Sequence, residues 1–345
     1  MPIVIDGGHV PKLLALKNRP RSERPASKQN GYIRIALINN MPDAALEDTE
    51  IQFYELFDAA AGGIPISLKL FSLPELPRND AGQRHVNNFY FDINELLNDR
   101  FDGVVMTGTE PRQQNLRDEA YWPVLTKVLD WAETNTASTV LSCLAAHAGV
   151  LYSGGIPRHR LSDKQFGVFE YKKVRDHALT AGGGDTMRIP HSRWNEVRAD
   201  ALESCGYEVL LQSAQAGVDL FVKKKRDSLF VHFQGHPEYS TRTLLKEYRR
   251  DIKRFLRGER ETYPNMPQGY FDAAATKLLS DFGDKVTANP GEELLAEFPE
   301  TAVASGLQET WQRSAASVYG KWLKYLVSRK AEASSLSSMT PAVRG

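Results

Sequence analysis

The chain has little cysteine: Cys143 and Cys205 are the only two among 345 residues, and they stand far apart. Two such residues cannot form a disulfide framework, which excludes a small stapled secreted domain. No Cys-x-x-Cys pair is present, and the eight histidines are scattered along the chain, so we predict no metal site. Unpaired cysteines fit a reducing cytoplasm, where we expect the protein to reside.

The chain also lacks long apolar runs and an excess of either charge. No segment approaches the roughly 18 consecutive apolar residues of a membrane span. Residues 1–31 carry charges throughout instead of the apolar centre of a signal peptide. Lys plus Arg number 43, as do Asp plus Glu. Such a chain offers no field that would attract nucleic acid or an anionic membrane. We therefore expect a soluble protein with small-molecule partners, no nucleic-acid partner and no membrane partner.

Strand and helix patterns alternate in the first half of the chain. Short apolar runs indicate strands, and apolar residues spaced by three and four indicate helices. The predicted strands are 32–39, 66–71, 101–108 and 138–143, and the predicted helices are 46–60, 91–98, 120–134 and 144–152. This alternation favours an α/β fold with a parallel sheet covered by helices on both faces.

The texture changes after about residue 165, where several strand-like runs follow one another up to residue 234. Amphipathic helices are then predicted at 241–258, near 270–281, and at 306–330. We predict the following parts: a flexible arm at 1–31, an α/β domain at 32–262, a C-terminal helical extension at 263–330 that packs on this domain, and a disordered tail at 331–345.

Cys143 lies where the predicted strand "STVLS" gives way to the predicted helix "LAAHAGVLY". Open α/β sheets bind ligands at this edge. The unpaired N–H groups of a helix N-terminus stabilise a thiolate and can bind a developing oxyanion. A cysteine here is suited to nucleophilic catalysis, although a small buried side chain would also fit the end of an apolar strand.

A candidate base follows another apolar strand in the segment "FQGHPEY". His236 and Glu238 flank a stiff proline, so the carboxylate can bond one imidazole nitrogen and leave the other to take a proton from the thiol. A surface turn with an incidental histidine is the alternative. His147 is a rival base because it lies four residues after Cys143 on one helix face, but it has no carboxylate beside it in the sequence. We interpret His147 as pocket lining or a core histidine.

Several ordered segments carry a more specific signal, among them "ALEDTEIQFYELF", "FDGVVMTGTE", "LSCLAAHAGVLYSGGIPRHRLSDKQFGVFEY", "PHSRWNEV" and "GHPEY". From about residue 32 to 262, and again from 310 to 327, the chain resembles the homoserine O-acyltransferases of the succinyltransferase type. These enzymes are relatives of class I glutamine amidotransferases and act early in methionine synthesis. The resemblance implies a flavodoxin-like, open and mostly parallel sheet with extra β-strands and C-terminal helices.

The resemblance also implies a reaction in two halves. Cys143 would take the acyl group from succinyl-CoA or acetyl-CoA as co-substrate, with no bound cofactor, and would pass it to the hydroxyl of L-homoserine. His236 would be the proton acceptor, with Glu238 as its partner. Backbone N–H groups near Leu144 and in the loop at Thr109 would form the oxyanion hole. A cytoplasmic homodimer is expected.

Further residues would choose the substrates. The resemblance places Lys164, Ser192 and Arg250 at the amino acid, and a cation such as Arg250 suits an α-carboxylate. Arg112 stands at the position that selects the acyl group. Its charge there would favour succinyl over acetyl by pairing with the free carboxylate, and the alternative is a side chain that points to solvent. The chain departs from the family in having "GTEP" in place of Gly-Ala-Pro, and in having Leu144 and His147 in place of Trp and Gln. The acceptor could therefore be another hydroxy amino acid.

Two other classes of function stay open. An amidotransferase-like or peptidase-like cysteine hydrolase could use the same strand-end histidine, although "LSCLA" lacks the glycines of Gly-x-Cys-x-Gly. A non-catalytic relative could use the pocket only for binding. The presence of Cys143, His236 and Glu238 together argues against that reading.

Overall fold

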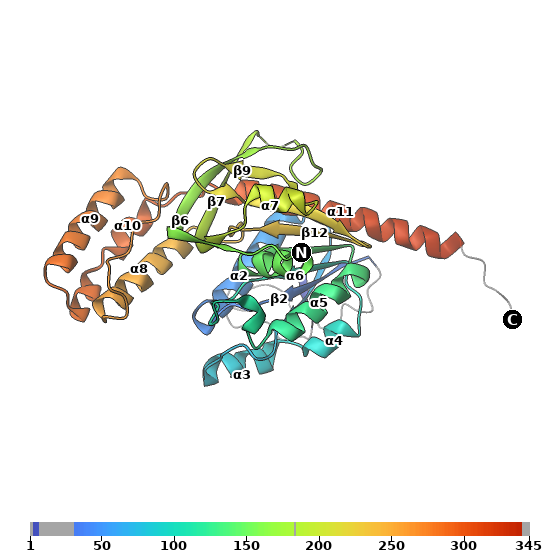
Figure 1. Cartoon of the computed structure of the whole chain (residues 1–345), viewed down its shortest axis with the longest axis horizontal. Helices are drawn as coiled ribbons and strands as arrows, with labels where there is room; N and C mark the ends of the chain where they lie inside the picture. The colour runs from blue at the N-terminus through green and yellow to red at the C-terminus, as the bar shows by residue number, and fades with distance from the viewer. Residues whose placement is uncertain (1–2, 7–30, 183, 340–345) are drawn as a thin grey trace.

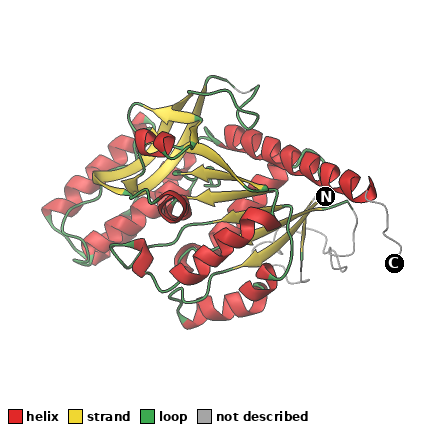
Figure 2. Ribbon diagram, turned by 45° about the vertical axis from the view of Figure 1, so that its right-hand side comes forward, coloured by secondary structure: helices red, strands yellow, loops and turns green. Residues whose placement is uncertain are grey.

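The computed structural model describes residues 3–6, 31–182 and 184–339. Its main layer is an eight-stranded sheet in the order β1-β3-β2-β4-β5-β12-β11-β8, which lies between helices in Figure 2. The strands are β1 (Ile3–Ile5), β2 (Ile33–Ile38), β3 (Ile66–Phe71), β4 (Gly103–Met106), β5 (Ser138–Ser142), β8 (Glu208–Val209), β11 (Leu220–Lys225) and β12 (Ser228–Phe233).

The strand order confirms the predicted fold class. The six strands from β1 to β12 pair in parallel, whereas β11 and β8 are antiparallel additions at one edge. Taken in chain order, β2, β3, β4, β5 and β12 occupy the flavodoxin-like arrangement 2-1-3-4-5. Their carboxyl ends therefore meet at one edge, where the order reverses between β2 and β4 and where ligands bind in such sheets.

Alternate side chains of the central strands enter two separate cores. Ile35 and Leu37 of β2 belong to one apolar cluster, and Ala36 and Ile38 belong to the other, as the two-residue period of a strand requires. Both faces are buried, which explains the unbroken apolar runs in the sequence. One face is covered by α2 (Asp43–Ala60) and α11 (Gln312–Met339), and the other by α4 (Ile93–Leu97), α5 (Trp122–Asn135) and α6 (Leu144–Gly154).

A second, antiparallel sheet has the order β10-β9-β6-β7. Its strands are β6 (His159–Lys173), β7 (Thr186–Glu196), β9 (Leu211–Ser213) and β10 (Gly217–Val218). The long β6–β7 hairpin shifts register between Arg160 and Gln165, and such irregularities redirect side chains. The N–H of His236, just beyond β12, donates to the carbonyl of Pro190 in β7 at 2.9 Å. This bond ties the small sheet to the carboxyl edge of the large one.

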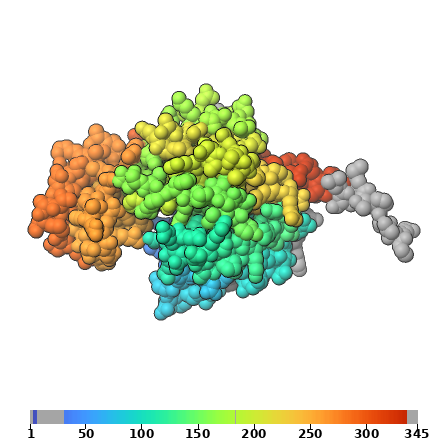
Figure 3. Space-filling view, in the orientation of Figure 1, coloured from blue at the N-terminus to red at the C-terminus, as the bar shows by residue number. Residues whose placement is uncertain are grey.

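The C-terminal helices occupy two places. A separate apolar cluster joins α8 (Thr243–Leu256) to α9 (Ala273–Ala288), α10 (Glu300–Ser305) and η3 (Glu292–Glu297). These helices form the lobe at the left of Figures 1 and 3. The last helix, α11, instead returns to the main sheet, where Trp322 donates to the Ser138 hydroxyl at 2.9 Å. The predicted extension at 263–330 thus contributes α9 and α10 to the lobe and α11 to the main core.

The ends of the chain differ from the sequence-based expectation. Ile3–Ile5, placed in the flexible arm, forms strand β1 and pairs with Ile66–Leu68, because its β-branched residues extend the edge of the sheet. The predicted tail from 331 is helical as far as Met339, since Ala and Ser there continue α11 without a breaker. Residues 7–30 and 340–345 of the predicted arm and tail lie outside the described residues. Within the described ranges, no helix is long and apolar enough to cross a membrane.

The short helical elements that the sequence reading missed include α3 (Asp80–Phe89), α7 (Ala199–Ser204), η2 (Leu116–Asp118), η3 and α10. The helix α3 begins at Asn79, whose side chain accepts hydrogen bonds from the N–H groups of Ala81 and Gly82. This is an ordinary N-cap. Gly82 is the one residue of α3 that is buried, so the apolar periodicity that reveals core helices is absent there.

Candidate active site

Cys143 occupies a sharp turn between β5 and α6. It is the N-cap residue of α6, with φ 54° and ψ −117°, a positive φ that is costly for any residue with a side chain. Backbone hydrogen bonds hold it there: its N–H donates to Phe233 in β12 at 2.8 Å, and its carbonyl accepts from Ala146 at 3.0 Å. The turn leaves the sulfur at the N-terminus of α6, as predicted for a nucleophile.

His236 and Glu238 come from the loop after β12, the strand beside β5. The His236 Nδ1 lies 2.8 Å from Glu238 Oε1, and the two side chains are 6% and 4% exposed. Burial alone lowers the pKa of His236, but the neighbouring Cys143 and Glu238 outweigh it and raise this pKa well above its usual value. The structure thus brings the three predicted residues together, in an arrangement that favours a protonated imidazole at His236.

Tyr239 links this group to α8. Its ring stacks on the imidazole of His236, with ring centroids 4.2 Å apart and planes inclined by 17°. Its hydroxyl donates to Glu247 Oε1 at 2.7 Å, and its carbonyl accepts from the Trp311 indole at 2.9 Å. The imidazole is therefore held on one side by Glu238 and on its face by an anchored tyrosine.

The loop after β4 lies against the start of α6. Gly108 approaches so closely that a Cβ at this position would lie 2.8 Å from the Leu144 nitrogen, which requires glycine. The first N–H groups of a helix have no partner within it, so the N–H of Leu144 is available beside the sulfur. Thr109 and Leu144 both line a small, mainly apolar pocket at this point. The two predicted oxyanion-hole residues are thus neighbours.

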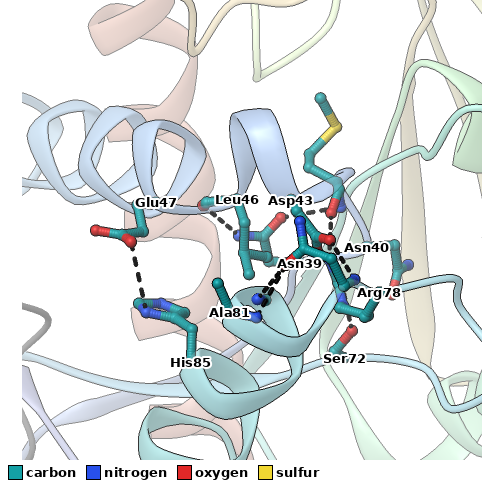
Figure 4. A network of polar contacts seen from close by, with 12 residues as sticks. Asn39, Asn40, Asp43, Leu46, Glu47, Ser72, Arg78, Ala81 and His85 are labelled. Atoms are coloured by element: carbon teal, nitrogen blue, oxygen red, sulfur yellow. Dashed lines mark hydrogen bonds and ion pairs between the residues drawn. The ribbon is translucent and has the colours of Figure 1, made fainter.

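An asparagine pair after β2, which the sequence reading did not assign, supports this loop. Figure 4 shows Asn39 and Asn40 within their network of polar contacts. The Asn40 N–H donates to the Thr107 hydroxyl at 2.8 Å, and its side-chain amide donates to the Thr107 carbonyl at 3.2 Å. Its side-chain oxygen accepts from Leu73 at 3.0 Å. Asn39 donates to the Leu46 carbonyl and to the Tyr90 hydroxyl. These bonds fix the ends of three neighbouring strands relative to one another.

Lys164, Ser192 and Arg250, predicted to bind the amino acid, converge on two carboxylates. Lys164 Nζ lies 2.9 Å from Asp251 Oδ2 and 3.6 Å from Glu247 Oε2. The Ser192 hydroxyl donates to Glu247. Arg250 lies 3.0 Å from Asp251 and 3.6 Å from Glu247. Two cations and two anions balance here, a charge pattern that suits a zwitterion.

Two comparisons with known proteins identify the family of this chain. The model of the homoserine O-succinyltransferase family matches residues 12–333. The chain belongs to this family. It is 44% identical over 296 residues to the homoserine O-succinyltransferase of Rhodopseudomonas palustris. The aligned region covers 86% of this chain and 89% of the relative. The chain is 43% identical over 295 residues to the homoserine O-succinyltransferase of Bradyrhizobium japonicum, with 85% and 90% covered. The protein is therefore an acyltransferase.

Among solved structures, the chain is similar to a glutamine amido transferase from Methylobacillus flagellatus. The TM-score is 0.48 at 15% sequence identity, and the match covers 86% of this chain and 96% of that one.

Arg112, predicted to select the acyl group of this acyltransferase, lies in an exposed stretch of the loop after β4. Its N–H and that of Gln113 donate to the buried Glu119 carboxylate at 2.6 and 2.7 Å. The described residues show no hydrogen bond or ion pair between its side chain and the catalytic group. A second cation, Arg158, is half-buried, donates to the Gln114 carbonyl at 3.2 Å, and lies within electrostatic range of Cys143.

His147 is a core residue, as interpreted from the sequence, and not a second base. It is 3% exposed, and its Nε2 lies 2.9 Å from the Gln234 side-chain oxygen. Burial lowers its pKa to about 3, so it stays neutral near pH 7. Among the described residues no group of three or more His, Cys, Asp or Glu could hold a metal ion.

The sequence reading missed the carboxylates that organise the amino-acid cluster. Glu247, Arg250 and Asp251 are spaced by three and four along α8, which places them on one helix face. That spacing is visible in the sequence. Its meaning depends on Lys164 and Ser192 from the small sheet, whose position relative to α8 only the fold supplies.

Proposed function

We propose that this acyltransferase transfers a succinyl group from succinyl-CoA to the hydroxyl of L-homoserine through an acyl-cysteine. The product, O-succinylhomoserine, would enter methionine synthesis. The observation that carries the proposal is Cys143 at its strained turn, next to a buried His236 that is paired with Glu238. The acyl group and the acceptor are those of the homoserine O-succinyltransferases to which this chain is similar.

In the first half-reaction, the Cys143 thiolate attacks the thioester carbonyl of the acyl-CoA. The oxyanion accepts hydrogen bonds from the N–H groups of Leu144 and Thr109. The bond to the CoA sulfur then breaks, and the imidazolium of His236 gives its proton to the departing thiolate. CoA leaves as a thiol, and an acyl-cysteine with a neutral His236 remains.

In the second half-reaction, His236 takes the proton of the acceptor hydroxyl while that oxygen attacks the acyl carbonyl. The bond to the Cys143 sulfur breaks, which restores the thiolate and the imidazolium. Glu238 keeps the imidazole oriented in both steps and stabilises its positive form. The sum is acyl-CoA plus alcohol to ester plus CoA, with no other reactant.

The amino-acid end of the acceptor would bind at the charge cluster on α8. The Arg250 side chain is 46% exposed, so it can turn toward an incoming α-carboxylate and hold it with two parallel hydrogen bonds. Glu247, which already accepts from Ser192 and Tyr239, can accept from the α-ammonium group. The tyrosine between Glu247 and His236 would then set the distance between the amino acid and the base.

Two cations near the loop after β4, Arg112 and Arg158, support a succinyl group over an acetyl group as the group transferred. The distal carboxylate of the succinyl group needs a positive partner, and we assign this role to both arginines.

The homodimer and the cytoplasmic location stay predictions.

Intact-mass analysis tests the function. After incubation with succinyl-CoA and no acceptor, we expect a mass increase of one succinyl group on the wild-type protein and on Cys205→Ala, but none on Cys143→Ala. Cys205 is the matched control because it is the other free cysteine and is similarly half-buried. Equal loss in both variants would mean that the wrong thiol has been named.

The acceptor is tested by adding L-homoserine, L-serine or other hydroxy amino acids to the isolated acyl-enzyme. Homoserine should discharge the adduct fastest and give the ester. Faster discharge by another hydroxy amino acid would identify that compound as the acceptor. Release of ammonia from glutamine, with no acyl adduct from either acyl-CoA, would instead support the hydrolase alternative.

A further inference from the structure

A fully buried carboxylate, that of Asp219, lies close enough to the catalytic histidine to interact with its charge. Asp219, between β10 and β11, is 0% exposed. Its Oδ1 accepts from the N–H of Gly235 at 2.6 Å, and its carbonyl accepts from the N–H of Gln234 at 3.2 Å. Since the N–H of His236 is bound to Pro190, three successive peptide groups leading into the catalytic loop are each anchored to another strand or loop.

The surroundings of Gly235 leave this peptide no room to move. A Cβ at Gly235 would lie 2.7 Å from His191 Nε2 and equally close to Ile189. The imidazole of His191 is 0% exposed, and its Nε2 lies 3.5 Å from Asp219 Oδ1. The glycine therefore packs directly on a buried histidine ring.

The hydrogen bonds of His191 fix its charge and tautomer. Its Nδ1 accepts from the Arg193 guanidinium at 3.2 Å, so this nitrogen carries no proton. Burial, with Arg193 and His236 nearby, lowers the pKa of His191 well below its usual value. The ring is thus neutral, with its proton on Nε2, where it can donate to the Tyr171 hydroxyl at 2.8 Å. A neutral His191 cannot neutralise Asp219.

Several buried oxygens in this region have no hydrogen-bond partner among the described residues: Asp219 Oδ2, Glu238 Oε2 and the Tyr319 hydroxyl. The three groups influence one another electrostatically. Orphaned buried oxygens are rare and costly, and two carboxylates close together carry a further penalty. This cost is understandable if the negative charge serves the imidazolium of His236.

We propose that Asp219 is a positioning residue for His236, holding the Gly235 peptide and stabilising the protonated imidazole with its charge. Asp219 does not touch the substrate. Burial raises the pKa of Asp219 to about 7, although His236, Arg193 and the bond from Gly235 oppose the shift. The groups that face it are His191 and Arg193 from β7, Tyr171 from β6, His236 and Glu238 from the loop after β12, and Tyr319 from α11.

The test compares Asp219→Asn with Asp219→Ala. The asparagine keeps an oxygen for the Gly235 N–H and removes the charge, whereas alanine removes both. In NMR titrations of histidine-labelled protein, with His236 assigned through His236→Ala, we expect Asp219→Asn to lower the pH midpoint of His236 by about one unit. We expect Asp219→Ala to lower kcat by about 10- to 100-fold with both KM values little changed, and Asp219→Asn to recover part of this loss.

Asp102→Asn is the matched control. Asp102 also accepts from a backbone N–H, that of Arg34 at 2.8 Å, but it lies before β4, at the opposite edge of the sheet. The Asp102→Asn variant should leave the pH midpoint of His236 and kcat unchanged. The proposal is overturned if Asp219→Asn titrates like the wild type, or if Asp102→Asn shifts the midpoint equally.

The inference rests on the proposed thiolate and imidazolium chemistry, but the titration needs no substrate. Absence of an acyl adduct on the wild-type protein would end the proposed function and leave the titration result standing. The near-isosteric asparagine variant keeps the test available if Asp219→Ala does not fold.

Discussion

The backbone of the active-site turn is strained at a single residue, Cys143. Its backbone lies at φ 54°, in a region where a Cβ is strained by about 1–3 kcal/mol. The surrounding hydrogen bonds to β12 and within α6 impose this geometry. The turn places Cys143 at the N-terminus of α6, where the proposed mechanism needs its nucleophile.

Replacement of Cys143 by glycine should therefore stabilise the fold relative to replacement by alanine. Both variants lose the thiol, but only glycine is free of the Cβ strain at positive φ. We expect Cys143→Gly to have the higher free energy of unfolding, by about 1 kcal/mol after the greater entropy of glycine in the unfolded chain is subtracted. Urea unfolding measures this difference. A more stable alanine variant would show that the turn is not strained.

The two arginines near the acyl loop can be ranked by their exposure. Arg112 is exposed, so a bond to a carboxylate there is screened and worth about 0–1 kcal/mol. Arg158 is half-buried and its charge acts more strongly. We expect Arg158→Gln to lower the ratio of kcat/KM for succinyl-CoA to that for acetyl-CoA by about 10-fold or more, and Arg112→Gly to lower it a few-fold. An unchanged ratio would remove the substituted residue from the acyl site.

For single residues, the sequence predicts the proposed nucleophile and base better than the residues that hold them in place. Cys143 and His236 each follow an apolar strand, and strand ends on one parallel sheet meet at one edge. Asn40, Asp219 and Glu247 act through contacts between segments far apart in the sequence, such as Gly235 with Asp219. Such contacts leave no local pattern to read.

Among the elements, α11 shows how a terminal helix becomes part of the central core. Its residues Trp322 and Leu326 are at most 2% exposed, and they lie where a Cβ on Gly103 would meet them at 2.8 and 2.7 Å. Contacts with α2 continue along the same face, including the stacked rings of Phe57 and Trp322. The last helix of the chain thus covers one face of the main sheet together with α2.

Truncations of α11 should separate its buried part from its exposed end. Removal of residues 331–345 takes away helix whose residues are exposed from 331 to 335, and we expect a loss below about 0.5 kcal/mol. Removal from Leu326 onward also deletes a fully buried leucine and the bonds of Lys330 to Tyr32 and Asp102. This should cost about 2–5 kcal/mol. Thermal and urea unfolding of both truncations measure the difference, and equal stabilities would contradict the assignment of α11 to the core.

The periodicity of an element determines whether it can be predicted from sequence. The strands β2 to β5 are buried on both faces, so their continuous apolar runs are recognisable. The hairpin β6–β7 extends beyond its apolar runs through polar residues such as Ser192 and Asn195, which are strand residues because they pair with Phe166 and Arg160. Tertiary pairing, not local preference, decides such boundaries.

Over the whole molecule, the large sheet supplies the active-site edge and the other layers complete it. The proposed catalytic residues follow β5 and β12, the proposed oxyanion loop follows β4, and the charge cluster of Lys164, Ser192 and Arg250 needs the small sheet and α8 together. In the proposed mechanism, the lobe formed by α8, α9, α10 and η3 contributes to the acceptor site through its first helix, α8.

Buried histidines should make the whole molecule sensitive to acid. Burial lowers the pKa values of His147 and His232 to about 3, from 6.5. Between these values the unfolded chain binds more protons, so each residue lowers the free energy of unfolding by about 1.4 kcal/mol per unit as pH falls.

Asp219, with its pKa raised to about 7 from 3.8, has the opposite effect: its protonated folded form is favoured at low pH, and this stability is lost as pH rises through about 7. We therefore expect His232→Phe, which can keep the stack on Phe221, to flatten the fall in stability between about pH 6 and pH 4. Asp219→Asn should steepen it, in each case by about 1.4 kcal/mol per pH unit. Urea unfolding at several pH values gives the three slopes. If the wild type and both variants lose stability in parallel, the buried groups do not titrate as the structure indicates.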